Sequence, residues 1–457
     1  MMSQELSRSL KPRHIAMISI GGIVGAGLFV GSSAAINATG PAVVLSYLIT
    51  GALVLLVMRS LGEMAVALPK VRSFTEFPRA GLGAWAGFVA GWLYWYFWAV
   101  TVPVEAIAGA KILHQWWPQV SETLLGLGLM AVMTGVNLMS ARSYGEFEFW
   151  FSSIKVAAIL AFIAIVGSYA FGWTGPHGSG GFAALTHHGG FMPKGFVAVL
   201  AGAVTVFFQL TGAEITTVAA AESSEPTRAV ARMSTSVIVR ILAFYVVSIF
   251  LIVSVAPWDS VKVGESPFAL VLTNMGFGWA SGALSLIILT AVLSCLNSAF
   301  YVCSRVLFVL AEHGDAPQLL VRLNARRVPV NSVWMSAIAG VLGVVAETQS
   351  KSSVFAFLIN NAGSIIVFVY MMVIVAQIRL RRERERRGEP APAVTMWLFP
   401  WASYAALIAM VALLVSMAFT DKSSTDLYVS LGTLAVAVIA YWIVRAWRPS
   451  TVRSPAA

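Results

Sequence analysis

Long apolar runs recur along almost the whole chain, and they limit its possible folds more than any other feature of the sequence. Each run holds about 20 residues with few charges, the length that an α-helix needs to cross a bilayer. The composition agrees, because 58% of the 457 residues are hydrophobic and 11% are charged, whereas soluble domains carry about 25% charged residues. A membrane β-barrel would instead show alternating segments of about 10 residues. The chain is therefore predicted to be an all-α integral membrane protein.

Twelve spans can be placed, and they form one membrane domain over residues 15–447. The predicted spans are 15–36, 41–68, 84–112, 122–140, 147–172, 195–221, 234–256, 277–311, 330–347, 353–379, 396–419 and 427–447. Short tails at 1–14 and 448–457 flank this domain. The charged segment "RLRRERERRGEPAP" between the tenth and eleventh spans is expected to be a solvated linker that begins as helix.

The basic residues predict the orientation of these spans. One set of loops and tails contains most of them: Arg8, Lys11, Arg13, Lys70, Arg72, Arg79, Arg142, Arg228, Arg232, Arg322, Arg326, Arg327, the run from Arg379 to Arg387, Arg445, Arg448 and Arg453. The opposite loops contain Lys111, Lys194, Lys262, Lys351 and Lys422. Because cytoplasmic loops are enriched in Lys and Arg, both termini are predicted to lie inside a bacterial cytoplasmic membrane. Contact with anionic lipid explains the net charge of +10, so no nucleic-acid partner is predicted.

The first span contains "GGIVGAGLFVG", in which five of eleven residues are glycine. Glycine is a weak helix former, and an unpaired backbone group is costly in hydrocarbon. We therefore expect the helix to break around Ile23 to Ala26. The sixth span has a similar interruption near Gln209, Thr211 and Gly212.

The two interruptions lie five spans apart, and broken helices at matching positions of two halves point to a transporter site. The predicted architecture is a five-plus-five inverted repeat. One repeat covers about 15–172, the other covers about 195–379, and two extra helices at about 396–447 follow them.

Half-helices that meet at the bilayer midplane would present free backbone groups of both kinds. The outer half of the first span would begin with free N–H groups and a positive dipole end, which suit a carboxylate. The inner half would end with free C=O groups, which suit an ammonium group. A zwitterion fits both, and Gly25 and Gly27 would let it approach the backbone. The alternative is helix packing, because small residues at four-residue spacing also make close contacts.

Charged residues inside the spans are the other candidates. Lys155, in the fifth span, would exchange a proton or stand where a sodium ion binds in a related scaffold; the alternative is snorkelling to the surface. Glu105, in the third span, would neutralise a substrate amine or a lysine or carry a proton, unless it forms a structural pair. Glu214 is a candidate for proton handling or gating. Glu222 and Glu63 have simpler interpretations as charges near span ends.

Aromatic residues offer a weaker prediction. Tyr94 and Trp98 could line the cavity and Phe208 could close it, although core packing or lipid contact explains such residues equally well. The six histidines lie in loops or at span ends, and no nucleophile–base or metal constellation accompanies them. Neither an enzyme nor a metal or other cofactor is predicted. A channel would need a ring of pore-lining groups, which the sequence does not provide.

The chain resembles the bacterial amino acid permease branch of the amino acid–polyamine–organocation superfamily. The resemblance is carried by "LKPRHIAMISIGGIVGAGLFVGSSAAI", "GPAVVLSYLITG", "GEMAVALP", "GWLYWYFW", "GEFEFWFSSIKV", "GFMPKGFVAVL", "GAEITTVAAAES", "LSCLNSAFYVCSRVLFVLAEHGDAP" and "WLFPW". The details of "GSSAAINATGPAV", "GEFEFW" and "GGFMPKGF" are most similar to the γ-aminobutyrate permeases.

This resemblance implies proton-coupled amino acid uptake, with the proton as coupling ion. It implies that the substrate carboxylate meets the amides of Ala26 and Gly27. The amine would meet carbonyls at Ile23 and in the sixth span near Phe208 and Thr211. The lysine of the family's fifth span matches Lys155. At Ala26 relatives commonly have a polar residue, so a hydroxyl contact is absent here.

The predicted function is therefore uptake of γ-aminobutyrate or a similar small amino acid. Its only predicted partners are this small molecule and the lipid bilayer. The alternatives are an amino acid exchanger, a permease for another neutral α-amino acid, and a sensor that binds without transport.

Overall fold

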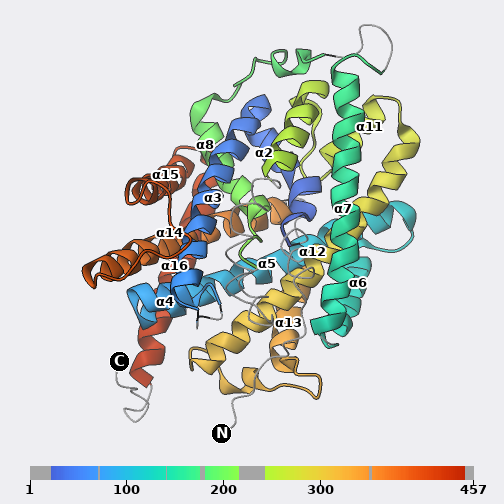
Figure 1. Ribbon diagram of the computed structural model, residues 1–457. Helices are drawn as coiled ribbons and strands as arrows, with labels where there is room; N and C mark the ends of the chain where they lie inside the picture. The colour runs from blue at the N-terminus through green and yellow to red at the C-terminus, as the bar shows by residue number, and fades with distance from the viewer. Residues whose placement is uncertain are drawn as a thin grey trace.

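The structure is a computed structural model that describes residues 22–69, 71, 73–139, 141–174, 181–215, 242–348 and 353–447. It is built from helices (Figure 1), and within those ranges the only β-pairing is an isolated bridge between Leu323 and Pro329. Several predictions lie outside the described residues: the tails at 1–14 and 448–457, the start of the first span, the far end of the sixth span with Glu222, and the start of the seventh.

The helices follow one another in the order of the predicted spans. They are the π-helix η1 (Gly27–Gly31), α2 (Ser32–Thr39), η2 (Gly40–Ala42), α3 (Val43–Ala67), α4 (Glu76–Leu82), α5 (Ala84–Trp116), α6 (Glu122–Asn137), α7 (Ala141–Ala170), η3 (Ala183–Leu185), α8 (Gly195–Leu210), the helix Leu242–Val255, η4 (Trp258–Ser260), α11 (Pro267–Asn274), α12 (Gly278–Glu312), η5 (Gln318–Val321), α13 (Val330–Glu347), α14 (Ser353–Arg386), α15 (Trp401–Ala418) and α16 (Asp421–Trp447).

Each of the twelve predicted spans contains one of these helices, which confirms the all-α membrane fold. Eight described helical stretches are long and apolar enough to cross a membrane, with Gly27–Ala67 counted as one stretch. The shorter apolar helices are Glu122–Asn137, Gly195–Leu210 and Leu242–Val255. Gly195–Leu210 is the part of the broken sixth span that precedes Thr211, and its length alone would not identify it as a membrane span.

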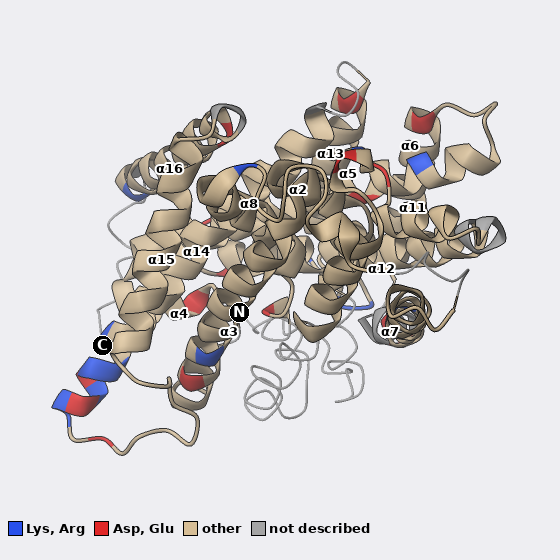
Figure 2. Cartoon of the chain, turned by 90° about the horizontal axis from the view of Figure 1, so that it is seen from above, with Lys and Arg blue, Asp and Glu red and all other residues tan. Residues whose placement is uncertain are grey.

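Helix α14 extends beyond its predicted end at residue 379 and continues to Arg386. Its last turns are charged rather than apolar, and ion pairs at four-residue spacing join Arg381 to Glu385 and Arg387 to Glu383. Such pairs stabilise an exposed helix, so the helix continues into the predicted linker. Figure 2 shows these charges gathered at one corner of the molecule. We call the end of the molecule that holds this corner, α4 and the end of α16 the basic end.

Two short α-helices lie outside the predicted spans. Helix α4 follows the second span and α11 follows the seventh, so they occupy the same place in each half of the chain. They lie at opposite ends of the molecule in Figure 1. This arrangement agrees with a repeat of inverted topology. Both helices contain proline and are too short to show helical periodicity in the sequence.

Helix α5 lies at the centre of the bundle, where it contacts α12, α13 and α14. In the apolar segment of α5, 83% of the residues are buried inside the protein, whereas in the apolar segment of α16 only 22% are buried. The extra helices α15 and α16 pack against each other and against α14, at one side of the bundle (Figure 1). A polar side chain on α5 is therefore placed in the interior.

Candidate functional site

The helix of the first span breaks where the glycine motif predicts a break. Gly22 and Ile23 are helical, Val24 and Gly25 form a bend, and the helix resumes at Ala26 before the π-helix η1. These residues are buried. The π-helical geometry was not predicted; such wide turns are rare and occur frequently at functional sites.

The sixth span breaks at the end of α8. Thr211 is extended, with φ −73° and ψ 144°, and its hydroxyl donates to the Phe207 carbonyl at 2.6 Å. Gly212 has a φ of +131°, which only glycine adopts at low cost. The helical conformation returns at Ile215. Both interruptions predicted from the sequence are therefore present.

The two breaks touch each other through their glycines. A Cβ on Gly212 would lie 2.7 Å from the carbonyl oxygen of Gly22. A Cβ on Gly25 would lie 2.7 Å from the Glu105 Oε1 atom and 2.6 Å from the Cys295 Cβ atom. The packing interpretation of the glycines therefore holds, and it holds together with the break.

Glu105, on α5, caps the outer half of the first span. The amide of Ala26 donates to both carboxylate oxygens of Glu105, at 3.1 and 3.0 Å. A carboxylate at the first free N–H of a helix is stabilised by the hydrogen bond and by the helix dipole. Glu105 thus stands where the resemblance implies a substrate carboxylate, rather than at the amine position considered for it.

The carbonyl predicted to bind the amine also has a partner. The hydroxyl of Tyr245 donates to the Ile23 carbonyl at 2.8 Å. The thiol of Cys295 lies 3.7 Å from the Gly22 carbonyl. Both free ends of the broken helix are therefore satisfied by side chains from other spans, as buried backbone groups require.

Lys155 is buried in α7, with no exposed surface. The snorkelling interpretation is therefore wrong. The charges of Glu148, on the same helix, and of Glu105 act on its ammonium group. Lys155 thus connects the capped break of the first span to a second buried acid.

Glu214 belongs to the break of the sixth span. Its carboxylate accepts hydrogen bonds from the Tyr94 hydroxyl at 3.2 Å, from the Tyr370 hydroxyl at 2.9 Å and from the amide of Gly212 at 3.1 Å. Tyr94 therefore binds Glu214 rather than the glycine turn of the first span. The ring of Phe74 packs edge-on against Tyr94 at 4.3 Å.

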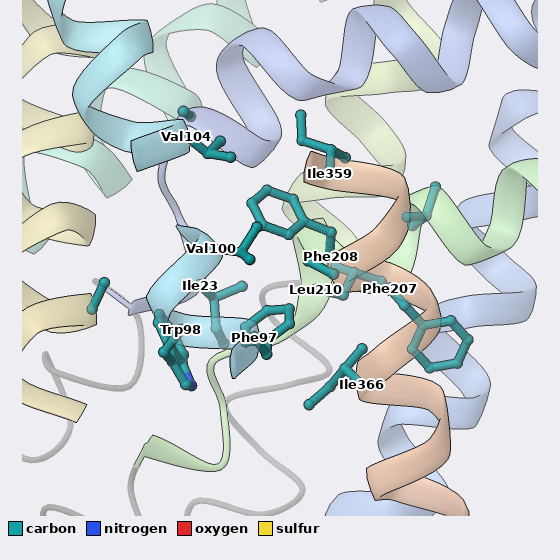
Figure 3. Close-up of a cluster of buried hydrophobic side chains, with 14 of the residues drawn as sticks. Ile23, Phe97, Trp98, Val100, Val104, Phe207, Phe208, Leu210, Ile359 and Ile366 are labelled. Carbon is teal, nitrogen blue, oxygen red and sulfur yellow. The ribbon is translucent and has the colours of Figure 1, made fainter. Parts of the chain in front are cut away.

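The aromatic residues beside the breaks pack mainly with one another. Figure 3 shows Phe208 directed toward Val100, with Phe207 on the other side. The ring centroids of Phe97 and Phe208 are 5.8 Å apart, and those of Phe97 and Trp98 are 5.2 Å apart. Phe208 is 5% exposed and lies next to the broken segments, as a gate residue would.

Four participants were not singled out as site residues from the sequence: Tyr245, Tyr370, Cys295 and Glu148. Each is a polar group inside an apolar run, which is the only sequence signal they carry. That signal does not reveal which backbone group a tyrosine or a cysteine meets. Glu148 was part of the quoted motif "GEFEFWFSSIKV", and an acid seven residues before a buried lysine could have been selected.

Comparison with known proteins identifies the family to which the chain belongs. The amino acid permease family matches residues 14–453 of the chain. The chain is an amino acid permease. It is therefore a transporter rather than an enzyme.

The relatives of this permease cover nearly its whole length. The γ-aminobutyric acid permease of Bacillus subtilis (strain 168) is 42% identical over 440 residues, which are 96% of this chain and 94% of that protein. The γ-aminobutyric acid permease of Escherichia coli (strain K12) is 41% identical, over 95% of this chain and 93% of that protein. The aromatic amino acid transport protein of the same strain is 35% identical, over 96% and 95%.

Among solved structures, the permease is similar in fold to a manganese transporter of Eremococcus coleocola, solved in a mutant form. The TM-score is 0.58 at 15% sequence identity, over 96% of this chain and 95% of that chain. At this identity the similarity concerns the fold alone.

Proposed function

We propose that this permease takes up γ-aminobutyrate, or a similar small amino acid, together with a proton across a bacterial cytoplasmic membrane. The basic end faces the cytoplasm and both termini lie inside, because Lys and Arg concentrate there. The observation that carries the proposal is the carboxylate of Glu105 on the Ala26 amide, beside the buried Lys155.

The position of Glu105 suggests how substrate and proton are coupled. The substrate carboxylate would meet the amides of Ala26 and Gly27, and it can reach the amide of Ala26 only when Glu105 leaves it. Protonation removes the charge from Glu105 and weakens a charge-assisted hydrogen bond. A protonated Glu105 would therefore yield the amide of Ala26 to the substrate, and one proton would bind with each substrate molecule.

The amine would bind on the opposite side of the break. Displacement of the Tyr245 hydroxyl would open the carbonyl of Ile23, which lies beside the close contacts made at Gly25 and Gly212. Thr211 and Phe208 lie at the facing break of the sixth span. Glu214 would respond to substrate through the turn that holds Gly212, and Tyr94 would hold Glu214.

A second candidate is a permease or exchanger for another neutral amino acid. The observation that favours it is the 35% identity to an aromatic amino acid transport protein. The two candidates share the same backbone site and differ in the side chains that would receive the rest of the substrate.

The test uses the purified permease in proteoliposomes with labelled γ-aminobutyrate. We expect uptake against a concentration gradient when the outside is acidic, and exchange without a pH gradient. Accumulation that is independent of the pH gradient would contradict proton coupling. Competition by a panel of amino acids, with better competition from an aromatic or other α-amino acid than from γ-aminobutyrate, would favour the second candidate.

A further inference from the structure

Glu148 is a buried acid to which the mechanism above gives no role. It lies on α7, has no exposed surface, and faces α12. The hydroxyl of Ser152 donates to its Oε1 atom at 3.2 Å, and the hydroxyl of Ser294 donates to the same atom. Its Oε2 atom is buried and has no hydrogen-bond partner within the described part of the chain.

A carboxylate oxygen left unsatisfied in the interior is costly, and it calls for an explanation, of which a role in proton transfer is one. The Nδ2 atom of Asn297, on the same stretch of α12, is also buried without a partner among the described residues. Its Oδ1 atom accepts from Asn137 of α6 at 2.7 Å. A buried acceptor on α7 and a buried donor on α12 are therefore both unsatisfied among the described residues.

Glu148 and Lys155 lie on the same face of α7. They are seven residues apart, which is two helical turns and about 10 Å along the axis. The charged groups that act on Lys155 are Glu148 from its own helix and Glu105 from α5, with the Cys295 thiol from α12. The charge that acts on Glu148 is Lys155, and α12 contributes serine hydroxyls to it. Lys155 is thus placed between two acids on different helices.

We propose that Glu148 is the proton acceptor on the cytoplasmic side of Lys155. This inference rests on the proton-coupled uptake proposed above. After substrate leaves, the Lys155 ammonium gives a proton to the Oε2 atom of Glu148 and takes one from the protonated Glu105. Lys155 is unchanged by this step, Glu105 becomes a carboxylate again, and Glu148 becomes a carboxylic acid. Glu148 then releases the proton to water on the cytoplasmic side.

The free Oε2 atom is the feature that suits this role. The hydroxyls of Ser152 and Ser294 both use Oε1, so a proton can be received at Oε2 without breaking either bond. The return of charge to Glu105 restores its bond to Ala26 and closes the anion site until the next proton arrives.

The decisive experiment is Glu148→Gln in proteoliposomes, with counterflow and pH-driven accumulation measured on the same preparation. Gln keeps the shape and the Oε1 acceptor but cannot receive a proton. We expect counterflow to be retained while accumulation falls about tenfold or more, as for the loss of a positioned proton-transfer group. Wild-type accumulation in Glu148→Gln, or equal loss of counterflow and accumulation, would overturn the inference.

Controls separate this inference from the function on which it rests. If the wild-type permease shows no pH-driven uptake, the proposed function fails, whatever Glu148 does. Glu347→Gln is the matched control, because Glu347 is a buried acid at the end of α13 that pairs with Lys111 at 3.3 Å; both activities should remain. If Glu148→Gln does not fold, Glu148→Asp should slow accumulation more than counterflow, and unchanged accumulation would overturn the inference.

Discussion

Position 25 in the first span has no room for a methyl group in place of the glycine hydrogen. A Cβ there would lie 2.7 Å from the Cys295 sulfur and at the same distance from the Glu105 carboxylate. Glu105 cannot move without disturbing its cap on Ala26. The smallest side chain is therefore incompatible with the capped break.

We predict that Gly25→Ala lowers uptake by roughly tenfold or more, because relieving such a clash costs about 1–3 kcal/mol. The matched control is Gly128→Ala on α6, where a Cβ would meet nothing within 4 Å. In a helix interior that change should leave uptake intact and raise stability by up to about 1 kcal/mol. Equal behaviour of the two variants in uptake and thermal melting would contradict the assignment of Gly25.

The sequence indicates which residues inside the spans are functional candidates, but it does not indicate which groups they contact. Glu105 and Lys155 could be selected because charge inside an apolar span is rarely without function. The bond from Ala26 to Glu105 joins residues 79 positions apart, and no local pattern encodes such a contact. For the same reason, Tyr245 could not be assigned to the carbonyl of Ile23.

At the scale of elements, α4 is held to the end of α12 at the basic end. His313 Nε2 lies 3.2 Å from Glu76 Oε1, and Arg79 pairs with Asp315. The hydrogen bond to Glu76 raises the pKa of His313 above its ordinary value, and partial burial opposes this rise. The protonated histidine therefore binds α4 more strongly than the neutral one.

This raised pKa gives a pH dependence with a definite sign. The stabilisation from His313 is complete below the ordinary histidine pKa of about 6.5 and is lost as pH rises through the raised value. We predict that the melting temperature of the wild type exceeds that of His313→Gln most at acidic pH, and that the difference shrinks in alkaline buffer. Glu76→Gln should remove the same pH-dependent difference. A difference that is constant with pH would show that the bond carries no proton linkage.

The long helices could be predicted because each buries a continuous apolar run, and the two breaks because glycine interrupts such runs. Helices α4 and α11 could not, since eight residues or fewer give no periodicity and their positions depend on tertiary contacts. The π-helical start of the outer half of the first span has no sequence signature either. In the structure η1 packs against α8 and α11.

For the whole molecule, the distribution of basic residues predicts which end faces inward. The native cysteines are both buried, so they can stay in place while single cysteines are introduced. Trp173, after α7, is 80% exposed, and the side chain of Arg387 at the basic end is 63% exposed.

We predict that a membrane-impermeant maleimide labels Trp173→Cys in intact cells and labels Arg387→Cys only after the membrane is opened. The unmodified permease is the control and should remain unlabelled in both cases. The reverse pattern of labelling would contradict the proposed orientation and, with it, the cytoplasmic position assigned to Glu148.

The central claim is that Glu105 holds the Ala26 amide until a proton releases it to the substrate carboxylate. The direct measurement is equilibrium binding of labelled γ-aminobutyrate to purified wild type and Glu105→Gln over a range of pH. Wild-type affinity should weaken with rising pH by up to about tenfold per pH unit, as uptake of one proton requires. The affinity of Glu105→Gln should be independent of pH. A variant that binds with the pH dependence of the wild type would contradict the claim.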